Sequence, residues 1–278
     1  MGGDTVLMLY FSGTGNTAHI ARLFSEKTGA QCLSIEAETD FSAQIADTDT
    51  IAFAYPIYGS RVPRIMREFV ARHMSELAGR KLIILVTQMF FSGDGARVFT
   101  DMFWDGAVEV IYAEHFTMPN NVGNVPLFPF HPSRRKRRRD MRRAEAKMMR
   151  VCDEIKAGVV RKRGFSRFSQ LLGSIQGRLW QGDSKDPLPQ PGMEERARTG
   201  VRIRKSCNVC GVCVDVCPMK NLEIDEGSAG HEQILSNAVS KITHKNNCTV
   251  CYRCVNRCPQ KAITVLFHMK PMWQYRGL

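Results

Sequence analysis

The sequence predicts an α/β fold with a doubly wound parallel sheet of about five strands, followed by a smaller α+β domain. An apolar run at 5–11 stops at a glycine-rich turn, and strands then alternate with helices through the first half of the chain. Cysteine-rich loops fill the last third. Parallel sheets of this kind bind ligands at the carboxyl ends of their strands, so functional residues are expected at that edge.

The first strand, at 5–11, is continuously apolar, as is typical of a strand that is buried on both faces of a sheet. The remaining elements follow from the same alternation of short apolar runs and amphipathic stretches. We expect further strands at 31–35, 50–54, 81–87 and 107–113, and helices at about 17–28, 63–74 and 133–157.

Changes in composition along the chain divide it into domains. We expect a first domain at 1–160, a basic, proline-containing linker at 161–195, a second domain at 196–268 and a tail at 269–278. The run 186–192 contains three prolines, which is typical of a linker.

Eight of the ten cysteines lie in two motifs with the same spacing, C-x2-C-x2-C-x3-C-P. Clustering of this kind indicates metal binding rather than disulfides. Three cysteines at this spacing wrap one cubane cluster, while the fourth points to the partner cluster. The alternative is zinc, which prefers paired C-x2-C units. The spacing therefore predicts two crossed ligand sets: Cys207, Cys210, Cys213 and Cys258 for one cluster, and Cys248, Cys251, Cys254 and Cys217 for the other.

Over about 201–265 the chain resembles a bacterial-type two-cluster ferredoxin, including the tails Cys217-Pro-Met-Lys-Asn-Leu and Cys258-Pro-Gln-Lys-Ala-Ile. This resemblance implies two [4Fe-4S] clusters. The connection between the motifs is longer than in a minimal ferredoxin, with 226–237 as the inserted part.

The turn at 12–17 separates a buried strand from a helix N-terminus, where backbone amides, hydroxyls and the helix dipole favour a phosphate. It lacks the lysine of an ATP-binding loop and the G-x-G-x-x-G of dinucleotide folds. The turn instead resembles the phosphate loop of flavodoxins. The resemblance to flavodoxins extends over about residues 4–160 and implies an FMN-binding domain. On that resemblance the phosphate contacts are Ser12, Thr14, Gly15, Asn16 and Thr17.

Two further loops, here called the second loop (55–59) and the third loop (88–95), follow the third and fourth predicted strands, where flavodoxins clasp the isoalloxazine ring. Tyr58 is the expected stacking ring, although the aromatics of both loops fit ordinary packing as well. Asp94 tunes the ring, transfers a proton or caps the helix after Gly95. The implied ring contacts are Pro56, Ile57, Tyr58, Gly59, Phe90, Ser92, Gly93 and Asp94.

Both halves together resemble the flavodoxin–ferredoxin fusion proteins of anaerobic microbes, as does the segment 118–121. The resemblance implies an iron–sulfur flavoprotein that relays electrons between a low-potential donor and an acceptor. It supplies no catalytic acid or base. Three alternatives remain: an FMN-dependent reductase of a small organic substrate, a redox-sensing nucleic-acid-binding protein, and a flavodoxin fold that has lost its cofactor.

The net charge of +12 comes from one segment, since 134–178 holds 16 Lys/Arg and 4 Asp/Glu. Three interpretations compete: a solvated helix face, a docking patch for an acidic redox partner, and a nucleic-acid contact, which no interleaved aromatics support. An apolar stripe at helical spacing either packs between domains or lies on a membrane surface. The stripe consists of Phe165, Phe168, Leu171, Leu172, Ile175, Leu179 and Trp180.

No apolar run reaches the roughly 18 residues that a membrane-spanning helix needs. The first ten residues lack a charged lead and a cleavage site, so a cytoplasmic location is expected. Cys32 and Cys152 are predicted to be buried thiols. His115, His131 and His244 are isolated in the sequence and are expected to be structural or surface residues.

Overall fold

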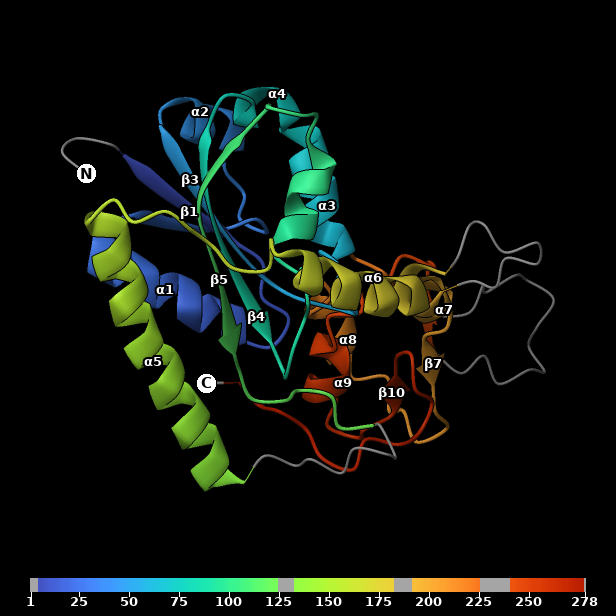
Figure 1. The fold of residues 1–278 in the computed structure, drawn as a ribbon. Helices are drawn as coiled ribbons and strands as arrows, with labels where there is room; N and C mark the ends of the chain where they lie inside the picture. Colours follow the sequence, from blue (N-terminus) through green and yellow to red (C-terminus); the bar gives the residue numbers. More distant parts are fainter. Residues whose placement is uncertain (1–4, 125–132, 183–191, 226–240, 278) are drawn as a thin grey trace, which may run out of the picture. The chain divides into compact units, whose positions relative to one another are not determined.

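The computed structural model describes residues 5–124, 133–182, 192–225 and 241–277 (Figure 1). The chain divides into two compact units. Unit 1 comprises Met1–Asn120, Pro132–Gly192 and Gly277–Leu278, and unit 2 comprises Asn121–His131 and Met193–Arg276. The proline run at 186–192 lies almost entirely outside the described residues, as do the insertion at 226–237 and His131. No helix in the described part of the chain is long and apolar enough to cross a membrane.

Unit 1 contains a parallel sheet in the order β2-β1-β3-β4-β5-β6, which confirms the predicted fold class. The order reverses between β1 and β3, so a crevice for ligands is expected at the carboxyl ends of these strands. The structure has six strands because a two-residue strand, too short to show periodicity, pairs with β5. The strands are β1 Val6–Tyr10, β2 Gln31–Ser34, β3 Thr50–Pro56, β4 Lys81–Gln88, β5 Glu109–Thr117 and β6 Arg161–Lys162.

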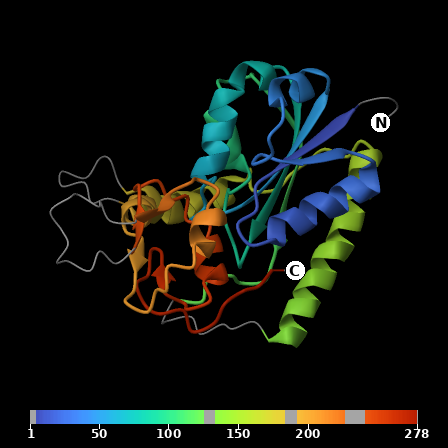
Figure 2. The ribbon, with the colours of Figure 1, turned by 180° about the vertical axis from the view of Figure 1, so that it is seen from behind.

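Helices α1 and α5 lie side by side on one face of the sheet (Figures 1 and 2). Met8 of β1 belongs to the core under these helices, and its neighbours Leu7 and Leu9, which alternate to the other face, are buried too. This two-sided burial explains why β1 is apolar at every position. The helices of unit 1 are α1 Asn16–Thr28, α2 Phe41–Ala46, α3 Arg64–Arg72, α4 Met74–Leu77, the 3-10 helix η1 Arg97–Met102, α5 Arg134–Lys156 and α6 Arg167–Gln181.

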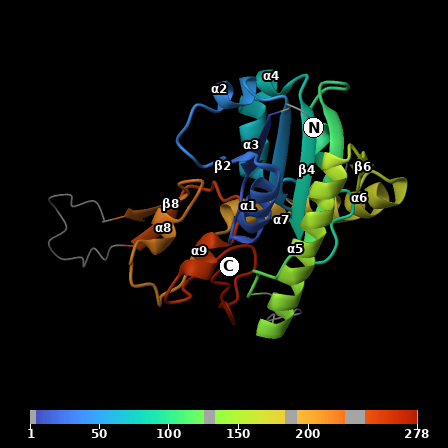
Figure 3. The same ribbon diagram turned by 90° about the vertical axis from the view of Figure 1, so that its left-hand side faces the viewer.

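Much of the segment predicted as a linker at 161–195 is an ordered part of unit 1. Strand β6 extends the sheet and leads into α6 (Figure 3). One face of α6 carries glycines and packs closely against two loops of the sheet. Only glycine fits there, because a Cβ at Gly173 would overlap the Asp94 carboxylate and one at Gly177 would overlap the Arg61 guanidinium. The spacing of these glycines, four residues apart, was the available sequence signal.

Unit 2 also extends beyond the predicted boundaries of 196–268. The Met272 amide donates to the Gly123 carbonyl over 2.9 Å, and the Asn124 side chain donates to the Phe267 carbonyl. In the predicted tail, the Gln274 amide donates to the Cys258 carbonyl over 2.7 Å. Segments 121–124 and 269–276 therefore pack with the cysteine motifs. Hydrogen bonds between residues distant in sequence hold these segments in place, and such bonds produce no local pattern in the sequence from which they could be predicted.

The core of unit 2 is built from two similar halves, each with a cysteine motif, a short helix and a strand. Cys213 lies in α8 and Cys254 lies in α9, 41 positions later. Strands β7 and β10 pair antiparallel, as do β8 and β9. The elements are α7 Met193–Thr199, β7 Arg202–Ile203, α8 Val212–Asp215, β8 Leu222–Asp225, β9 Lys241–His244, α9 Arg253–Arg257 and β10 Ile263–Thr264.

Candidate cofactor sites

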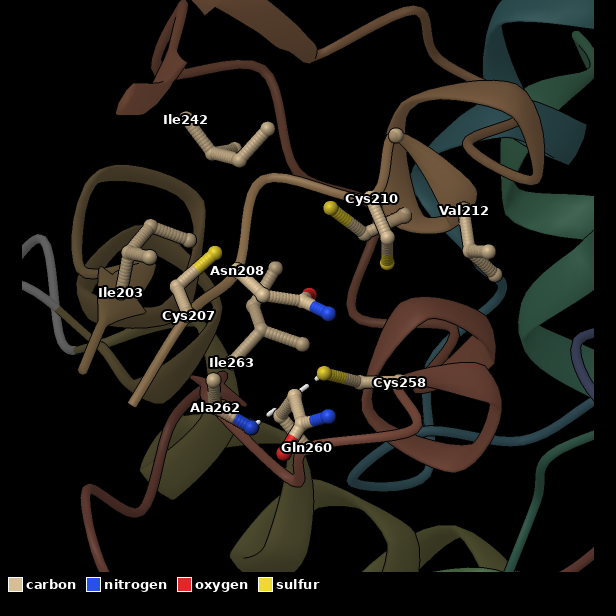
Figure 4. A pocket seen from close by; sticks show the side chains of 12 residues that line it. Ile203, Cys207, Asn208, Cys210, Val212, Ile242, Cys258, Gln260, Ala262 and Ile263 are labelled. Carbon is tan, nitrogen blue, oxygen red and sulfur yellow. Dashed lines mark hydrogen bonds between the residues drawn. The ribbon is translucent and has the colours of Figure 1, made fainter. Parts of the chain in front are cut away.

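Two cavities of unit 2 are each lined by four cysteines. Cys207, Cys210, Cys213 and Cys258, here called the first cysteine set, line one cavity. Figure 4 shows the sulfur atoms of Cys207, Cys210 and Cys258 around this space. The second cysteine set, Cys217, Cys248, Cys251 and Cys254, lines the other cavity. In each set, three cysteines come from one motif and the fourth from the other motif.

The backbone bends around both cavities through left-handed residues at matching positions. Val209 and Val250 have φ values of 55° and 62°, and Lys220 and Lys261 have values of 47° and 51°. Both pairs are 41 positions apart. A β-branched residue in this region is a genuine outlier that costs on the order of 1–3 kcal/mol. Such strain is kept where the loop must direct several side chains toward one point, and no sequence pattern predicted it.

Backbone amides donate hydrogen bonds to cysteine sulfurs in both sets. The amide of Val209 donates to Cys207 Sγ over 3.4 Å, and the amide of Val250 donates to Cys248 Sγ over 3.3 Å. The fourth cysteines receive similar bonds, from Asn221 to Cys217 at 3.3 Å and from Ala262 to Cys258 at 3.2 Å. These bonds stabilise negative charge on sulfur, as a thiolate ligand requires.

The thiols oppose one another's ionisation. Burial, followed by the charges of Cys258 and Cys207, raises the pKa of Cys213 to about 11. Burial and the charge of Cys251 likewise raise the pKa of Cys248 to about 12. Four thiolates in one cavity therefore need a positively charged group between them, and an all-sulfur donor set suits an iron–sulfur cluster. Among the described residues, no three His, Cys, Asp or Glu side chains are grouped to hold a single metal ion.

The predicted phosphate loop joins β1 to α1 in unit 1. Ser12 Oγ accepts a hydrogen bond from the Gly15 amide over 3.1 Å, and Gly15 has a φ of 105° that turns the chain into the helix. Asn16 Nδ2 donates to the Pro119 carbonyl over 2.9 Å. The loop contains hydroxyls and a helix N-terminus but no lysine or arginine. This donor set fits a phosphate group held without a counter-cation.

Thr17 is placed differently from the other predicted phosphate contacts. Its side chain is 1% exposed, and its hydroxyl lies 2.7 Å from the hydroxyl of Thr87 on β4. Thr17 therefore links α1 to the sheet, whereas Ser12, Thr14, Gly15 and Asn16 form the turn. This role was hidden in the sequence because Thr87 is 70 positions away.

The two loops that were predicted to hold the flavin ring pack under α6. The rings of Tyr58 and Trp180 are 6.3 Å apart between centroids, and a Cβ on Gly59 would lie 2.5 Å from Trp180. A Cβ on Gly93 would lie 2.5 Å from the Gly173 nitrogen. In the third loop Phe90 is 56% exposed. Pro56 and Ile57 are half-buried at the end of β3.

Ser92 and Asp94 are both only 1% exposed in this arrangement. Asp94 Oδ2 forms an ion pair with Arg97 over 2.7 Å, and η1 begins after Ala96 without a side-chain cap. The carboxylate therefore does not cap that helix. Its other oxygen, Oδ1, has no hydrogen-bond partner among the residues that the structure describes, and it faces Gly173.

Two protein-family models match the sequence, one in each unit. A flavodoxin domain model matches residues 7–124, and a 4Fe-4S dicluster domain model matches residues 206–262. The chain has the domain order of a flavodoxin–ferredoxin fusion. Unit 1 contains nearly all of its flavodoxin domain, and unit 2 contains its dicluster ferredoxin domain. No curated protein matches the sequence significantly.

Several solved structures resemble part of the fusion. Megasphaera elsdenii flavodoxin is 21% identical, with 51% of this chain and 99% of that chain covered and a TM-score of 0.36. A Lactobacillus acidophilus flavoprotein in complex with FMN has 12% identity, coverages of 41% and 93%, and a TM-score of 0.34. General stress protein 14 of Treponema denticola, in complex with FMN, has 13% identity, coverages of 54% and 98%, and a TM-score of 0.41.

A charged cluster around one buried glutamate in the flavodoxin domain was missed by sequence reasoning. Glu114, with no exposed surface, pairs with Lys147 over 2.8 Å and with Arg163 over 3.4 Å. His115 is 4% exposed, and its Nδ1 lies 3.3 Å from Ser92 Oγ in the third loop. Burial, partly opposed by Glu114, lowers the pKa of His115 to about 4, so the ring is neutral at pH 7.

The basic run begins helix α5 of the flavodoxin domain, where Ser133 caps the helix by accepting from the Lys136 amide. Four arginines of this helix line a hollow of about 490 Å³. Gly277 also lines it, and a Cβ on Gly277 would lie 3.1 Å from the Thr14 carbonyl of the phosphate loop. The lining arginines, here called the arginine hollow, are Arg134, Arg137, Arg138 and Arg142.

The neutral state of His115 predicts a pH dependence of stability. Its folded pKa lies below the unfolded value of about 6.5, so the unfolded chain binds more protons between these values, and stability is lost as the pH falls through this window. Between pH 7 and pH 5 the wild type should lose about 2 kcal/mol more unfolding free energy than His115→Gln. Anaerobic urea unfolding followed by circular dichroism measures this difference. Equal pH dependence of the two proteins would show that His115 is not held neutral.

Proposed function

We propose that the chain relays electrons between a low-potential donor and an acceptor, using FMN in the flavodoxin domain and two [4Fe-4S] clusters in the ferredoxin domain. The order of the two matched domains supports an iron–sulfur flavoprotein that transfers electrons. The finer proposal is supported above all by the exchange of the fourth cysteines, Cys217 and Cys258, between the two cysteine sets. Exchange of this kind belongs to proteins that hold two cubane clusters close together.

In this proposal the first cysteine set holds one cluster and the second cysteine set holds the other. Support comes from the four-cysteine cavities, the amide bonds to sulfur and the mutual opposition of the thiols to ionisation. The amides that donate to sulfur remove electron density from the ligands, which raises the reduction potential of a cluster bound there. Four of the eight cysteines are buried and three are partly buried, whereas Cys210 is exposed, which suits electron entry or exit on its side of the first cavity.

The phosphate of FMN is proposed to bind at the turn formed by Ser12, Thr14, Gly15 and Asn16. When bound, the flavin exchanges electrons singly or in pairs, whereas each cluster passes one electron at a time. The residues of the turn orient the group by hydroxyl and amide contacts at the positive end of α1. Thr17, the fifth residue predicted to contact the phosphate, also fixes the turn to the sheet through Thr87.

We further propose that an acidic redox protein docks at the arginine hollow. Four guanidinium groups against one carboxylate, that of Glu145, around one concave surface support this choice, because opposite charge steers a partner toward the patch and orients it. The hollow reaches the phosphate loop through Gly277, so a partner docked there would approach the flavin side of the flavodoxin domain.

The cluster assignment predicts opposite outcomes for two matched substitutions. Cys217→Ala should expose the remaining thiols of the second cysteine set to alkylation and leave the first cysteine set protected by its cluster. Cys258→Ala should give the reverse pattern. Anaerobic iodoacetamide labelling with peptide mass spectrometry, together with iron and sulfide analysis, reads out both. Labelling confined to the other three cysteines of the motif that carries the substitution would instead mean that each motif holds its own cluster.

The phosphate assignment is tested by comparing FMN with riboflavin, which lacks the phosphate. Thr14→Val should weaken FMN binding by roughly tenfold, the value of one hydrogen bond to a charged group, and leave riboflavin binding unchanged. Fluorescence titration of flavin-depleted protein measures both affinities. Thr100→Val is the matched control, since that hydroxyl donates to the Arg97 carbonyl away from the loop. An equal loss for both flavins would place the phosphate elsewhere.

The docking proposal predicts a salt-dependent rate. Arg137→Gln combined with Arg138→Gln should slow electron transfer with a reduced acidic ferredoxin several-fold at low ionic strength and have little effect at high salt. Arg22→Gln combined with Arg72→Gln makes the same change in net charge at exposed positions outside the hollow and should have a smaller effect. Stopped-flow absorbance measures the second-order rates. The same slowing in both double variants would point to net charge rather than a docking surface.

A further inference from the structure

Helix α6 of unit 1 turns its glycines toward the protein and most of its large apolar residues toward solvent. Gly173, Gly177 and Trp180 are buried, and each contacts a loop of the sheet or its side chains. At about 100° per residue the opposite side of the helix forms one continuous stripe. This exposed stripe consists of Phe168 at 68% exposure, Leu171 at 59%, Ile175 at 54% and Leu179 at 66%.

An ordinary surface helix turns its apolar side toward the core, so the orientation of α6 needs an explanation. The glycine face fixes this orientation, because any rotation of the helix that brought the stripe inward would replace Gly173 at Asp94 by a larger side chain. Soluble proteins rarely leave a contiguous apolar surface of this kind without a contact that covers it.

The charge around the stripe has one sign. Residues 157–182 contain five Lys/Arg and no Asp/Glu. Arg167 and Arg178 lie on α6 itself, both on the same side of the stripe and exposed. Arg161 and Arg163 are paired with the acidic residues Glu154 and Glu114 of neighbouring elements. The remaining three basic residues are Lys162 on β6 and the two arginines of the helix.

We propose that the exposed stripe of α6 binds an anionic membrane surface, with the helix in the plane of the interface. Apolar side chains then enter the boundary between headgroups and acyl chains, and Arg167 and Arg178 contact lipid phosphates, as in other amphipathic interfacial helices. A symmetric contact with a second copy fits less well, because it would bring the arginines of both copies together with no acidic residue of α6 opposite them. The inference does not depend on either proposed cofactor.

The test is flotation of the full-length, anaerobically purified protein with vesicles. Vesicles of equal parts phosphatidylcholine and phosphatidylglycerol should carry the protein upward, and vesicles of phosphatidylcholine alone should carry much less. Because the chain has a net charge of +12, adsorption by charge alone is the main rival explanation. Variants that leave the charge unchanged separate the two.

Leu171→Ser combined with Ile175→Ser should reduce binding to the anionic vesicles by about tenfold or more. Trp104→Ser removes an apolar side chain of similar exposure, 60%, elsewhere in unit 1 and should bind as the wild type does. Arg167→Gln combined with Arg178→Gln should reduce the preference for anionic vesicles several-fold. All these side chains point to solvent, and thermal unfolding checks that each variant is folded.

Three outcomes would overturn the proposal. Binding that Leu171→Ser/Ile175→Ser does not reduce would show adsorption by charge alone. Absence of binding to both kinds of vesicle, with a dimer in analytical ultracentrifugation that the same variant dissociates, would assign the stripe to a second copy. Absence of vesicle binding with a monomeric protein would leave the other domain of this chain or a protein partner as the occupant of the stripe.

Discussion

The ferredoxin domain depends on holding four sulfur atoms around each of two cavities against their mutual repulsion. Burial alone makes these thiols reluctant to ionise, and neighbouring sulfurs add to the effect. The chain offsets part of this cost with amide hydrogen bonds to sulfur and accepts left-handed conformations at Val209 and Val250 to direct the side chains. Since the fourth cysteines are exchanged, neither motif completes a cavity by itself, and the two halves must fold together.

In the flavodoxin domain the main constraint is different: its functional loops must meet at one edge of a parallel sheet. The turn after β1 presents hydroxyls and the positive end of α1, while Thr17 anchors it to Thr87. The loops after β3 and β4 lie under α6, which touches Tyr58 through Trp180 and the Asp94 region through Gly173. Beneath them, Glu114 and Lys147 pair inside the protein, beside the neutral His115. A helix expected to be a linker thus shapes the loops that were expected to hold the flavin.

Positive charge is divided between two helices whose surfaces differ in chemistry. The arginine hollow on α5 is concave and carries net positive charge, from four arginines against the single carboxylate of Glu145, and it suits a charged partner that approaches in water. The exposed stripe of α6 combines two arginines with four large apolar side chains, which suits an interface that is both apolar and anionic. The two surfaces need not compete, and simple net charge does not distinguish them.

The sequence by itself determined the fold class, the two domain types and the spacing of the eight clustered cysteines, because periodicity, turns and cysteine spacing are local and act within a few residues. It also placed the strand–turn–helix of 5–28, where an apolar run meets Gly15. Tertiary structure decided the rest. The orientation of α6 depends on Asp94 and Arg61, distant in sequence, and an apolar stripe alone does not say which side of a helix is covered. The same holds for Thr17 against Thr87 and for the burial of His115: these contacts join residues far apart in the chain, and only the folded packing brings them together.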